Sequence, residues 1–575
     1  MAASSQHTVN TFATWPSDWL ASRLAHGVVT GAAFVHPAEL QRDLAPAVAS
    51  ATSNDCRDAF RAAWTTAAPH VFVTAHPTFA ISPFQIAHAL NESRDTEVPP
   101  AATHPASQFA YQDFGPPGRL VRVRHEQDLD VRLAEFANGV RFNFKATDFA
   151  ADSVELHVRV GDGMLSQLES QPGLGLLANY MVMGGGLGRH TQPEFTGVLA
   201  GRTIHVAFQT GSDALTFRGA AASRDLLLAL QIVAAYLTDT AYRPEVMRDA
   251  RASFTSMYAA IANAPSGSIP AFAFREMAGG DRRFGTPHAD ELFSRDLAEL
   301  RAWIEPQFKQ GPIEVSVVGT ATWEEASAAV ARTLGALPAR GSRAEPARDP
   351  AFRIPAPSLN VRSILIDPKL KQSGLAWYWP VQPFAGIHEE RRLRLLTAVL
   401  SNRVHERVRT ELGAAYSATA TFSAVSGFPN YNMIAVHTEV PPASIARVTS
   451  VIERAALELA LRGVPEDEFL RARQPFLRER EDNLRTNVYW GVTVLADAQE
   501  HPERLTAARD RSADSAAISR DELGALSKRL LDPGSSFRYV TIPSTPPPPT
   551  PARPAANATP GRQPKVGPAG TRGPR

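Results

Sequence analysis

The sequence predicts an α+β protein in which a large unit is repeated along 575 residues. Three segments, 70–74, 313–319 and 537–541, each contain a short apolar strand that follows a helical stretch and closes a unit. They lie roughly 220–245 residues apart, a plausible size for one large domain. The second unit contains strand signals and the third contains a long amphipathic helix, and together these patterns indicate the α+β class. The prediction is therefore two full units preceded by the end of another.

Residues 1–115 are predicted to be the incomplete end of a preceding domain together with a linker. Helical patterns at 37–48 and 54–66 lead into the apolar strand at 70–74. The proline-bearing stretch 97–108 is typical of a linker. Because no complete domain fits before that strand, we expect this segment to leave apolar surface and sheet edge uncovered.

The second unit is predicted to span 119–340 and to begin with a hairpin. Asn-Gly at 138–139 is a strong signal for a tight turn between two strands. In the strand at 154–160, valine and leucine alternate with polar and charged residues. Such alternation predicts one buried and one solvated face.

An apolar helix at 173–183 follows and, with the three glycines after it, reads GLGLLANYMVMGGG. Glycines end helices readily. Those at 184–188 do not predict a phosphate-binding loop, because they follow an apolar helix and do not lead from a strand into a helix N-terminus. The stretch resembles the metal helix of the insulinase/pitrilysin family of zinc peptidases, whose motif is H-x-x-E-H in the setting G-L-A-H-F-L-E-H-M-L-F-K-G-T. On that frame Leu176 and Tyr180 replace the two histidines, and Asn179 replaces the catalytic glutamate.

These replacements remove the chemistry of a zinc site. Zinc takes imidazole, thiolate or carboxylate ligands, and a peptidase of this type needs a carboxylate to accept a proton from the metal-bound water. The family's third ligand is a glutamate on a following helix, and this chain has no glutamate between Glu245 and Glu276. The run His388-Glu389-Glu390 lacks a second histidine at the required spacing. We expect no metal or other cofactor on this chain, and zinc on a catalytic half or partner.

The third unit is predicted to span 358–543, after a proline-bearing link. Residues 389–412 predict its main helix, because apolar residues recur at spacings of three and four: Leu393, Leu396, Leu400, Val404 and Val408. The glycine at 413 ends the helix, and a strand at 415–422 follows.

The end of this helix carries the candidate substrate-binding residues. The stretch 409–416, RTELGAAY, resembles the R-x-x-x-x-x-x-Y element in the last domain of the same family. Arg409 lies one position past the apolar stripe, about 100° around the helix, and Tyr416 begins the next strand. The resemblance implies that both bind the substrate backbone opposite the zinc, as donors to peptide carbonyls. The alternative is that Arg409 is a solvated helix end and Tyr416 a packed aromatic.

Composition limits the partners and the compartment. The formal net charge of +1 gives no reason to expect nucleic acid as a partner, and no apolar run is long enough to predict a membrane span. The proline-rich tail 544–575 has almost no large apolar residue and is predicted to be disordered. No signal peptide is visible. The compartment therefore stays open: cytoplasm by default, periplasm if the true N-terminus is missing.

The resemblance covers residues 1–543 and implies a fold of the LuxS metalloenzyme and peptidase type. Tandem homologous domains would each hold an antiparallel sheet covered on one side by helices. We expect the non-catalytic half of a zinc metallopeptidase, inactive alone, which closes over peptide substrates. A missing N-terminal half or a partner subunit with H-x-x-E-H would supply zinc and the general base. The alternative is a non-proteolytic assembly subunit, which a partner lacking H-x-x-E-H would favour.

Overall fold

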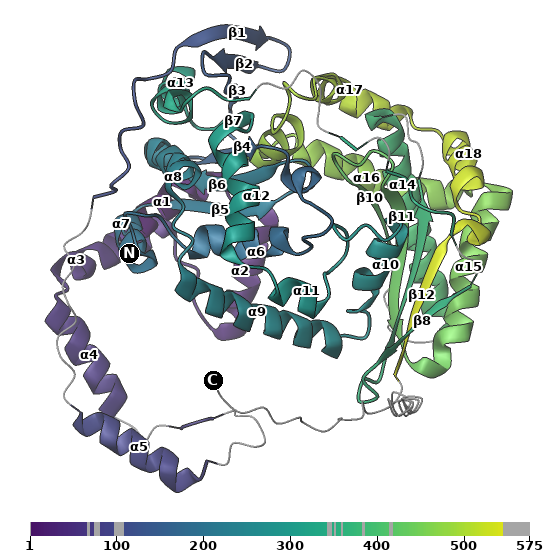
Figure 1. The fold of residues 1–575 in the computed structure, drawn as a ribbon, viewed down its shortest axis with the longest axis horizontal. Coiled ribbons are helices and arrows are strands. Elements are labelled where there is room, and N and C mark those ends of the chain that lie inside the picture. Colours follow the sequence, from purple (N-terminus) through teal and green to yellow (C-terminus); the bar gives the residue numbers. More distant parts are fainter. Residues whose placement is uncertain are drawn as a thin grey trace, which may run out of the picture.

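Figure 1 shows the chain as a computed structural model. The described residues are 2–65, 70–73, 81–96, 108–341, 348–349, 352–357, 360–381, 386–412 and 418–543. Within them the chain forms two β-sheets with helices packed on them, preceded by a group of N-terminal helices. No described helix is long and apolar enough to cross a lipid bilayer.

The first sheet has seven strands in the order β1-β2-β3-β7-β4-β6-β5. Its strands are β1 (Leu120–Glu126), β2 (Val131–Phe136), β3 (Arg141–Ala146), β4 (Val154–Val160), β5 (Ile204–Thr210), β6 (Leu215–Ala221) and β7 (Ile313–Gly319). The helices of this part are α6 (Leu174–Gly184), α7 (Gln192–Leu199), α8 (Leu226–Asp239), α9 (Pro244–Asn263), α10 (Ile269–Met277), α11 (Ala289–Phe293), α12 (Leu297–Gln310) and α13 (Trp323–Arg332). One face of the sheet and helices α6, α8 and α12 enclose the first hydrophobic core.

The second sheet has five strands in the order β10-β11-β9-β12-β8. Its strands are β8 (Arg362–Ile366), β9 (Ser373–Pro380), β10 (Thr419–Ala424), β11 (Asn432–Val440) and β12 (Phe537–Pro543). Its helices are α14 (Ile387–Leu412), α15 (Ile445–Arg462), α16 (Glu466–Asn483), α17 (Glu503–Ala517) and α18 (Arg520–Leu530). Helices α14, α15, α16 and α18 share a core with one face of this sheet, and α10 from the first part packs on the other face.

The predicted fold class is confirmed, with a correction to the sheets. Both are mixed rather than antiparallel, because β3 pairs with β7 and β8 pairs with β12 in parallel. Parallel neighbours need a long crossover connection, and both β7 and β12 reach their sheets after a run of helices. The sheets lie within the predicted second and third units. That these units are separate homologous domains stays a prediction.

Several local predictions are confirmed. The hairpin of β2 and β3 turns at residues 138–139, where Gly139 has a φ of 88° that disfavours a side chain. The strands predicted at 313–319 and 537–541 are β7 and β12. All five apolar residues of the stripe on α14 are fully buried, as the helical spacing requires.

Strand β4 departs from its predicted half-burial. His157 is 3% exposed and Arg159 is 9% exposed, so the polar face is buried as well. A third core closes this second face, where Val131, Leu133 and Val318 contact the segment 489–505. The prediction of helices on one side only is therefore wrong for both sheets, because the segment 489–505 covers the second face of the first sheet and α10 covers the second face of the other.

In its described residues, the N-terminal region consists of helices and contains no strand. They are α1 (Ala2–Thr11), α2 (Ser17–Thr30), α3 (Pro37–Ser50), α4 (Ser53–Thr65) and α5 (Pro83–Asp95). Helices α3 and α4 confirm the two predicted helical stretches. The strand predicted at 70–74 is wrong for residues 70–73, which are exposed, form no regular secondary structure and pair with no described strand. Thr74 and nearly all of the predicted linker 97–108 lie outside the described residues.

Apolar side chains line the outside of these N-terminal helices. In Figure 1, α4 and α5 extend away from the two sheets. On α4, Phe60 and Trp64 stack at a centroid distance of 5.8 Å, yet they are 65% and 50% exposed. Phe84 on α5 is 78% exposed. An apolar surface of this kind marks a site of protein contact.

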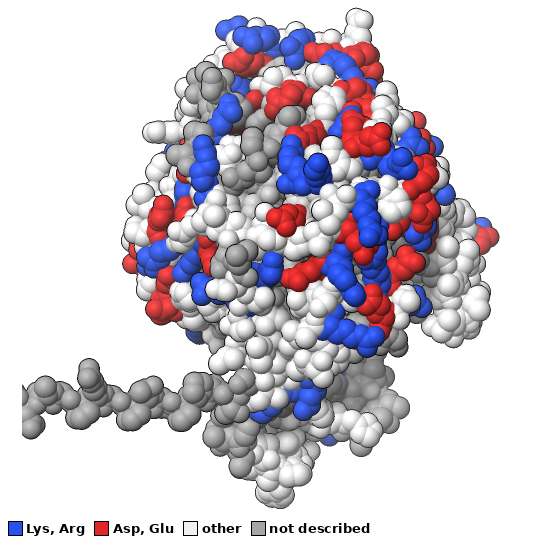
Figure 2. Space-filling model, turned by 90° about the vertical axis from the view of Figure 1, so that its right-hand side faces the viewer, with Lys and Arg blue, Asp and Glu red and all other residues white. Residues whose placement is uncertain are grey.

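Acidic and basic side chains alternate over one side of the molecule. Figure 2 shows Lys and Arg intermingled with Asp and Glu on the side that carries α15 and α18. Many are paired across helices, for example Arg392 with Glu522 at 2.7 Å and Arg403 with Glu468 at 2.8 Å. This face therefore presents no broad field of one sign.

Candidate functional site

Helix α6 holds Leu176, Asn179 and Tyr180, the three positions that the resemblance aligns with the zinc-binding motif. The partly buried Leu176 packs against the first core. The side-chain oxygen of Asn179 accepts a hydrogen bond from the backbone N–H of Thr210 at 2.6 Å, which ties α6 to β5. The side chains at these three positions pack against or hydrogen-bond to the elements around α6, and none of them is a strong metal ligand.

Tyr180 joins α6 to α9, a later helix that packs against it. Its hydroxyl accepts a hydrogen bond from Ser253 Oγ at 3.2 Å. Its ring lies edge-on to Phe254 at a centroid distance of 6.2 Å. The only glutamate of α9 is Glu245, in its first turn. Among the described residues no group of three His, Cys, Asp or Glu side chains could hold a metal ion.

Arg409 lies near the end of α14, as the helical spacing predicts. It is exposed, whereas the preceding Val408 is fully buried. Tyr416, its predicted companion, lies outside the described residues, as does the glycine at 413. The strand that follows is β10, which begins at Thr419 rather than at 415. The role of Arg409 and Tyr416 in substrate binding stays a prediction.

His388 at the start of α14 belongs to a charge cluster with α17. Its ring nitrogens lie 3.3 Å from Asp510 and 3.1 Å from Asp514. Arg391 and Arg392 also contact Asp514, at 2.7 and 3.0 Å. Burial raises the pKa of Asp514, but hydrogen bonds from the two arginines and His388 outweigh it and hold the pKa at about 2. The arginines therefore already neutralise the carboxylates that a metal would need.

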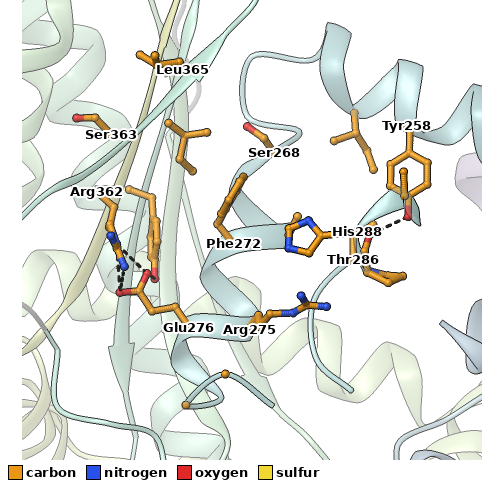
Figure 3. Close-up of a pocket in the computed structure, with 18 residues that line it drawn as sticks. Tyr258, Ser268, Phe272, Arg275, Glu276, Thr286, His288, Arg362, Ser363 and Leu365 are labelled. Atoms are coloured by element: carbon orange, nitrogen blue, oxygen red, sulfur yellow. Dashed lines mark hydrogen bonds and ion pairs between the residues drawn. The ribbon is translucent and has the colours of Figure 1, made fainter. Parts of the chain in front are cut away.

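A groove that the sequence did not predict lies between the two parts of the molecule (Figure 3). It has a volume of about 950 Å³ and runs between α9, α10, the loop 286–289 and strand β8. Phe272 is 50% exposed and Leu365 is 51% exposed, so apolar side chains face the opening. Strand β8 ends the sheet, and an edge strand presents unpaired backbone groups. The groove can therefore accept an extended peptide.

Ion pairs fix the walls of this groove. Arg362 of β8 lies 3.1 Å from Glu276 of α10, which also accepts a hydrogen bond from the hydroxyl of Tyr539 at 3.1 Å. Arg275 lies 2.8 Å from Glu291. Burial raises the pKa of Glu291, but hydrogen bonds led by Arg275 outweigh it and hold the pKa at about 2. The groove thus has charged walls that are already paired.

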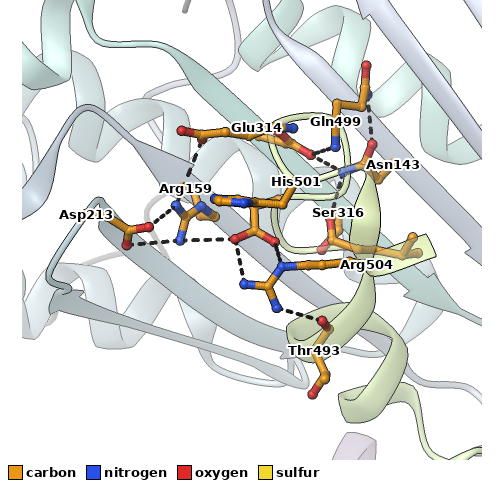
Figure 4. A network of polar contacts seen from close by, with 12 residues as sticks. Asn143, Arg159, Asp213, Glu314, Ser316, Thr493, Gln499, His501 and Arg504 are labelled. Carbon is orange, nitrogen blue, oxygen red and sulfur yellow. Dashed lines mark hydrogen bonds and ion pairs between the residues drawn. The ribbon is translucent and has the colours of Figure 1, made fainter. Parts of the chain in front are cut away.

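A buried ionic network locks the first sheet to the C-terminal part (Figure 4). Arg159 of β4 lies 2.9 Å from Asp213, 3.9 Å from Asp497 and 4.0 Å from Glu500. Arg504 lies 2.6 Å from Asp497. Burial lowers the pKa of Arg159, but these carboxylates, Asp213 first, raise it above its ordinary value. The guanidinium therefore stays charged inside the protein.

Glu314 of β7 forms the other half of this network. It accepts hydrogen bonds from the backbone N–H of Gln499 at 2.8 Å and from the side-chain amide of Asn143 at 2.6 Å. Burial raises the pKa of Glu314 to about 7, although both hydrogen bonds act in the opposite direction. Burial disfavours the charged form of the neighbouring His157 as well, and it lowers the pKa of that imidazole to about 3. Glu314 is occupied by contacts that hold the segment 497–504, which is a structural role.

Comparison with known proteins finds a family match for the central part of this chain. Residues 295–476 match the family profile described as Peptidase M16 inactive domain. This stretch, about a third of the chain, is similar to a peptidase M16 inactive domain. The match runs from α12 through β7, strands β8 to β11 and helices α14 and α15 into α16, and it leaves out β12 of the second sheet. The absence of zinc ligands on α6 is consistent with this description.

Two curated relatives with peptidase names are also similar to the chain. The chain is 20% identical over 468 residues to the chloroplastic stromal processing peptidase of Pisum sativum, with 73% of this chain and 37% of the relative covered. The Arabidopsis thaliana stromal processing peptidase is 18% identical, with 67% and 34% covered. The chain thus spans only a little over a third of these relatives.

Solved structures show the same fold. The periplasmic protease PqqL from Escherichia coli matches with a TM-score of 0.63 at 14% identity, over 94% of this chain and 60% of that one. An M16 inactive domain from Pseudomonas fluorescens matches with a TM-score of 0.62 at 14% identity, over 72% and 99%. A mutant of the ferredoxin protease FusC, in complex with Arabidopsis ferredoxin, also reaches 0.62 at 14% identity, over 92% and 58%.

Proposed function

We propose that this chain is the non-catalytic half of an M16-type zinc metallopeptidase, which closes over a peptide or protein substrate. Zinc and the general base would come from an N-terminal half or partner subunit that carries H-x-x-E-H. The observation that carries this proposal is α6. The positions that would bind zinc and activate water are filled by Leu176, Asn179 and Tyr180, which make packing and hydrogen-bond contacts.

The groove beside β8 supports the substrate part of this proposal. Its apolar opening and the free edge of β8 suit an extended segment of polypeptide. The complex of FusC with ferredoxin shows a similarly folded protease with a protein bound. Arg409 and Tyr416 would supply a further contact to the substrate backbone.

Reconstitution tests this function. The purified chain alone is expected to leave a quenched peptide uncleaved, because it lacks zinc ligands and a general base. Addition of an M16 catalytic half with an intact H-x-x-E-H should produce turnover well above that of the catalytic half alone, and a chelator should abolish it. If the catalytic half is equally active with and without this chain, the proposed role in substrate closure is wrong.

The exposed N-terminal helices indicate where such a partner would bind. We expect limited proteolysis to cut the segment 2–96 before the region 120–540, since Phe60, Trp64 and Phe84 are largely exposed. Bound catalytic half should slow these cuts. Equal protection of both regions in the isolated chain would show that the N-terminal helices need no partner.

An assembly subunit without a peptidase role is the second candidate. The same apolar N-terminal surface favours it, because it would serve any stable protein contact. The identity of the bound protein distinguishes the two. A natural partner that carries H-x-x-E-H supports the peptidase role, and one that lacks this motif supports assembly.

A further inference from the structure

A second cavity lies inside the C-terminal part, away from the groove described above. It has a volume of about 310 Å³ and lies where α14, α16, α17 and the segment 489–494 meet. Five arginines line it, and we call it the arginine cavity: Arg391, Arg394, Arg480, Arg504 and Arg511. So many cations in one small cavity need an explanation, because like charges repel one another strongly away from water.

Three of these arginines are neutralised by carboxylates. Arg391 lies 2.8 Å from Asp510 and also contacts Asp514. Arg394 lies 2.6 Å from Glu390, and Arg504 lies 2.6 Å from Asp497. These arginines form ordinary ion pairs and shape the walls of the cavity.

Arg480 and Arg511 have no such partner. Within the described part of the chain neither forms an ion pair or a hydrogen bond, and the Nε of each is buried without a partner. Arg511 is only 6% exposed. Glu479, the acidic residue nearest in sequence, also lines the cavity, but it is exposed and forms no ion pair with a described residue. Burial and the charge of Arg511 lower the pKa of Arg480 to about 10. Arg480 therefore remains a cation at neutral pH.

Aromatic rings hold the two guanidinium groups in place. Arg480 lies 3.9 Å from the ring centroid of Phe476, and Arg511 lies 4.0 Å from that of Tyr489. Stacking fixes the plane of a guanidinium group while its N–H donors stay free. Two oriented cations that reach one cavity from α16 and α17 are prepared for an anion with several oxygens.

We propose that the arginine cavity binds a small phosphate-type oxyanion, held chiefly by Arg480 and Arg511. Guanidinium groups bind phosphate oxygens through paired N–H donors, and an anion here would satisfy donors that are otherwise buried without acceptors. The volume suits inorganic phosphate or pyrophosphate rather than a length of peptide. The inference is independent of the proposed peptidase role.

A bound anion would join parts of the fold that are otherwise linked by side-chain packing. It would connect the end of α16 to α17 beside Tyr489, in the segment that covers the second face of the first sheet. We therefore expect the anion to stabilise the packing of the C-terminal part on the first sheet. The arginine cavity would make the stability of the chain depend on phosphate concentration.

Pyrophosphate binding to the full chain tests this proposal. Calorimetric titration and thermal melting with pyrophosphate or inorganic phosphate, at constant ionic strength set with sodium chloride, should show saturable binding and a rising melting temperature. The double variant Arg480→Gln/Arg511→Gln should bind roughly tenfold more weakly or worse, because charge-assisted hydrogen bonds are lost. Arg478→Gln, an exposed arginine on the same helix, is the matched control and should bind like the wild type.

Two further outcomes decide the proposal if the double variant folds poorly. Arg511→Lys keeps the charge but loses the paired donors, so its affinity should fall between wild type and double variant. Without ligand, the single glutamine variants should melt no lower than wild type, since each removes a repelling charge. No saturable binding by the wild type, or full binding by the folded double variant, would overturn the proposal.

Discussion

Replacement of Arg409 by alanine is expected to lower peptide turnover by about 10²–10³-fold in the complex of this chain with a catalytic half. That factor is typical for removal of one donor that stabilises the charge developing on a substrate carbonyl. Arg409 is exposed and forms no hydrogen bond or ion pair with a described residue. The melting temperature of the chain should therefore hardly change.

Tyr416→Phe removes only a hydroxyl and, like Arg409→Ala, should lower peptide turnover. His405→Ala serves as the control, because His405 is exposed one turn earlier on the same helix. It should leave turnover unchanged. If Arg409→Ala and Tyr416→Phe have no effect on turnover, or if a loss of stability accounts for the loss of turnover, both residues are structural.

Arg159→Ala is expected to give the largest loss of stability, about 3–5 kcal/mol in the free energy of unfolding. The change leaves the buried Asp213 without the arginine that lies 2.9 Å from it, and it removes one of the two arginines near the buried Asp497. An uncompensated buried charge is strongly unfavourable. Urea denaturation followed by tryptophan fluorescence measures the effect.

Arg218→Ala is the matched control for this measurement. Arg218 lies on the neighbouring strand β6 and is exposed, so its loss should change the free energy of unfolding by less than about 0.5 kcal/mol. Equal effects of the two substitutions would show that the network of Arg159 does not hold the sheet to the C-terminal segment.

Local patterns predicted the parts of this fold that depend on near neighbours. The stripe from Leu393 to Val408 predicted α14, and the Asn-Gly pair at 138–139 predicted the hairpin of β2 and β3. The strand expected at 70–74 is not formed by the described residues 70–73, because a strand also needs a pairing partner, which its own residues do not encode. The parallel pairs were missed for the same reason.

The buried face of β4 and the arginine cavity depend on contacts across long stretches of sequence. Arg159 meets Asp497 after more than 300 intervening residues, so alternation in 154–160 alone suggested a solvated face. Arg480 and Arg511 come from different helices, and nothing in either helix alone marks a shared cavity. The three candidate zinc positions on α6 could be proposed from the sequence because they lie within a single helical motif. Their correspondence to a zinc site stays a prediction.

Zinc content and peptidase activity of the isolated chain test the central claim most directly. After incubation with zinc and dialysis, the chain should retain well under one zinc per molecule, because Leu176, Asn179 and Tyr180 occupy the motif positions on α6. A quenched peptide should show no chelator-sensitive cleavage. One tightly held zinc per chain, together with cleavage that a chelator abolishes, would contradict the assignment of this chain as a non-catalytic half.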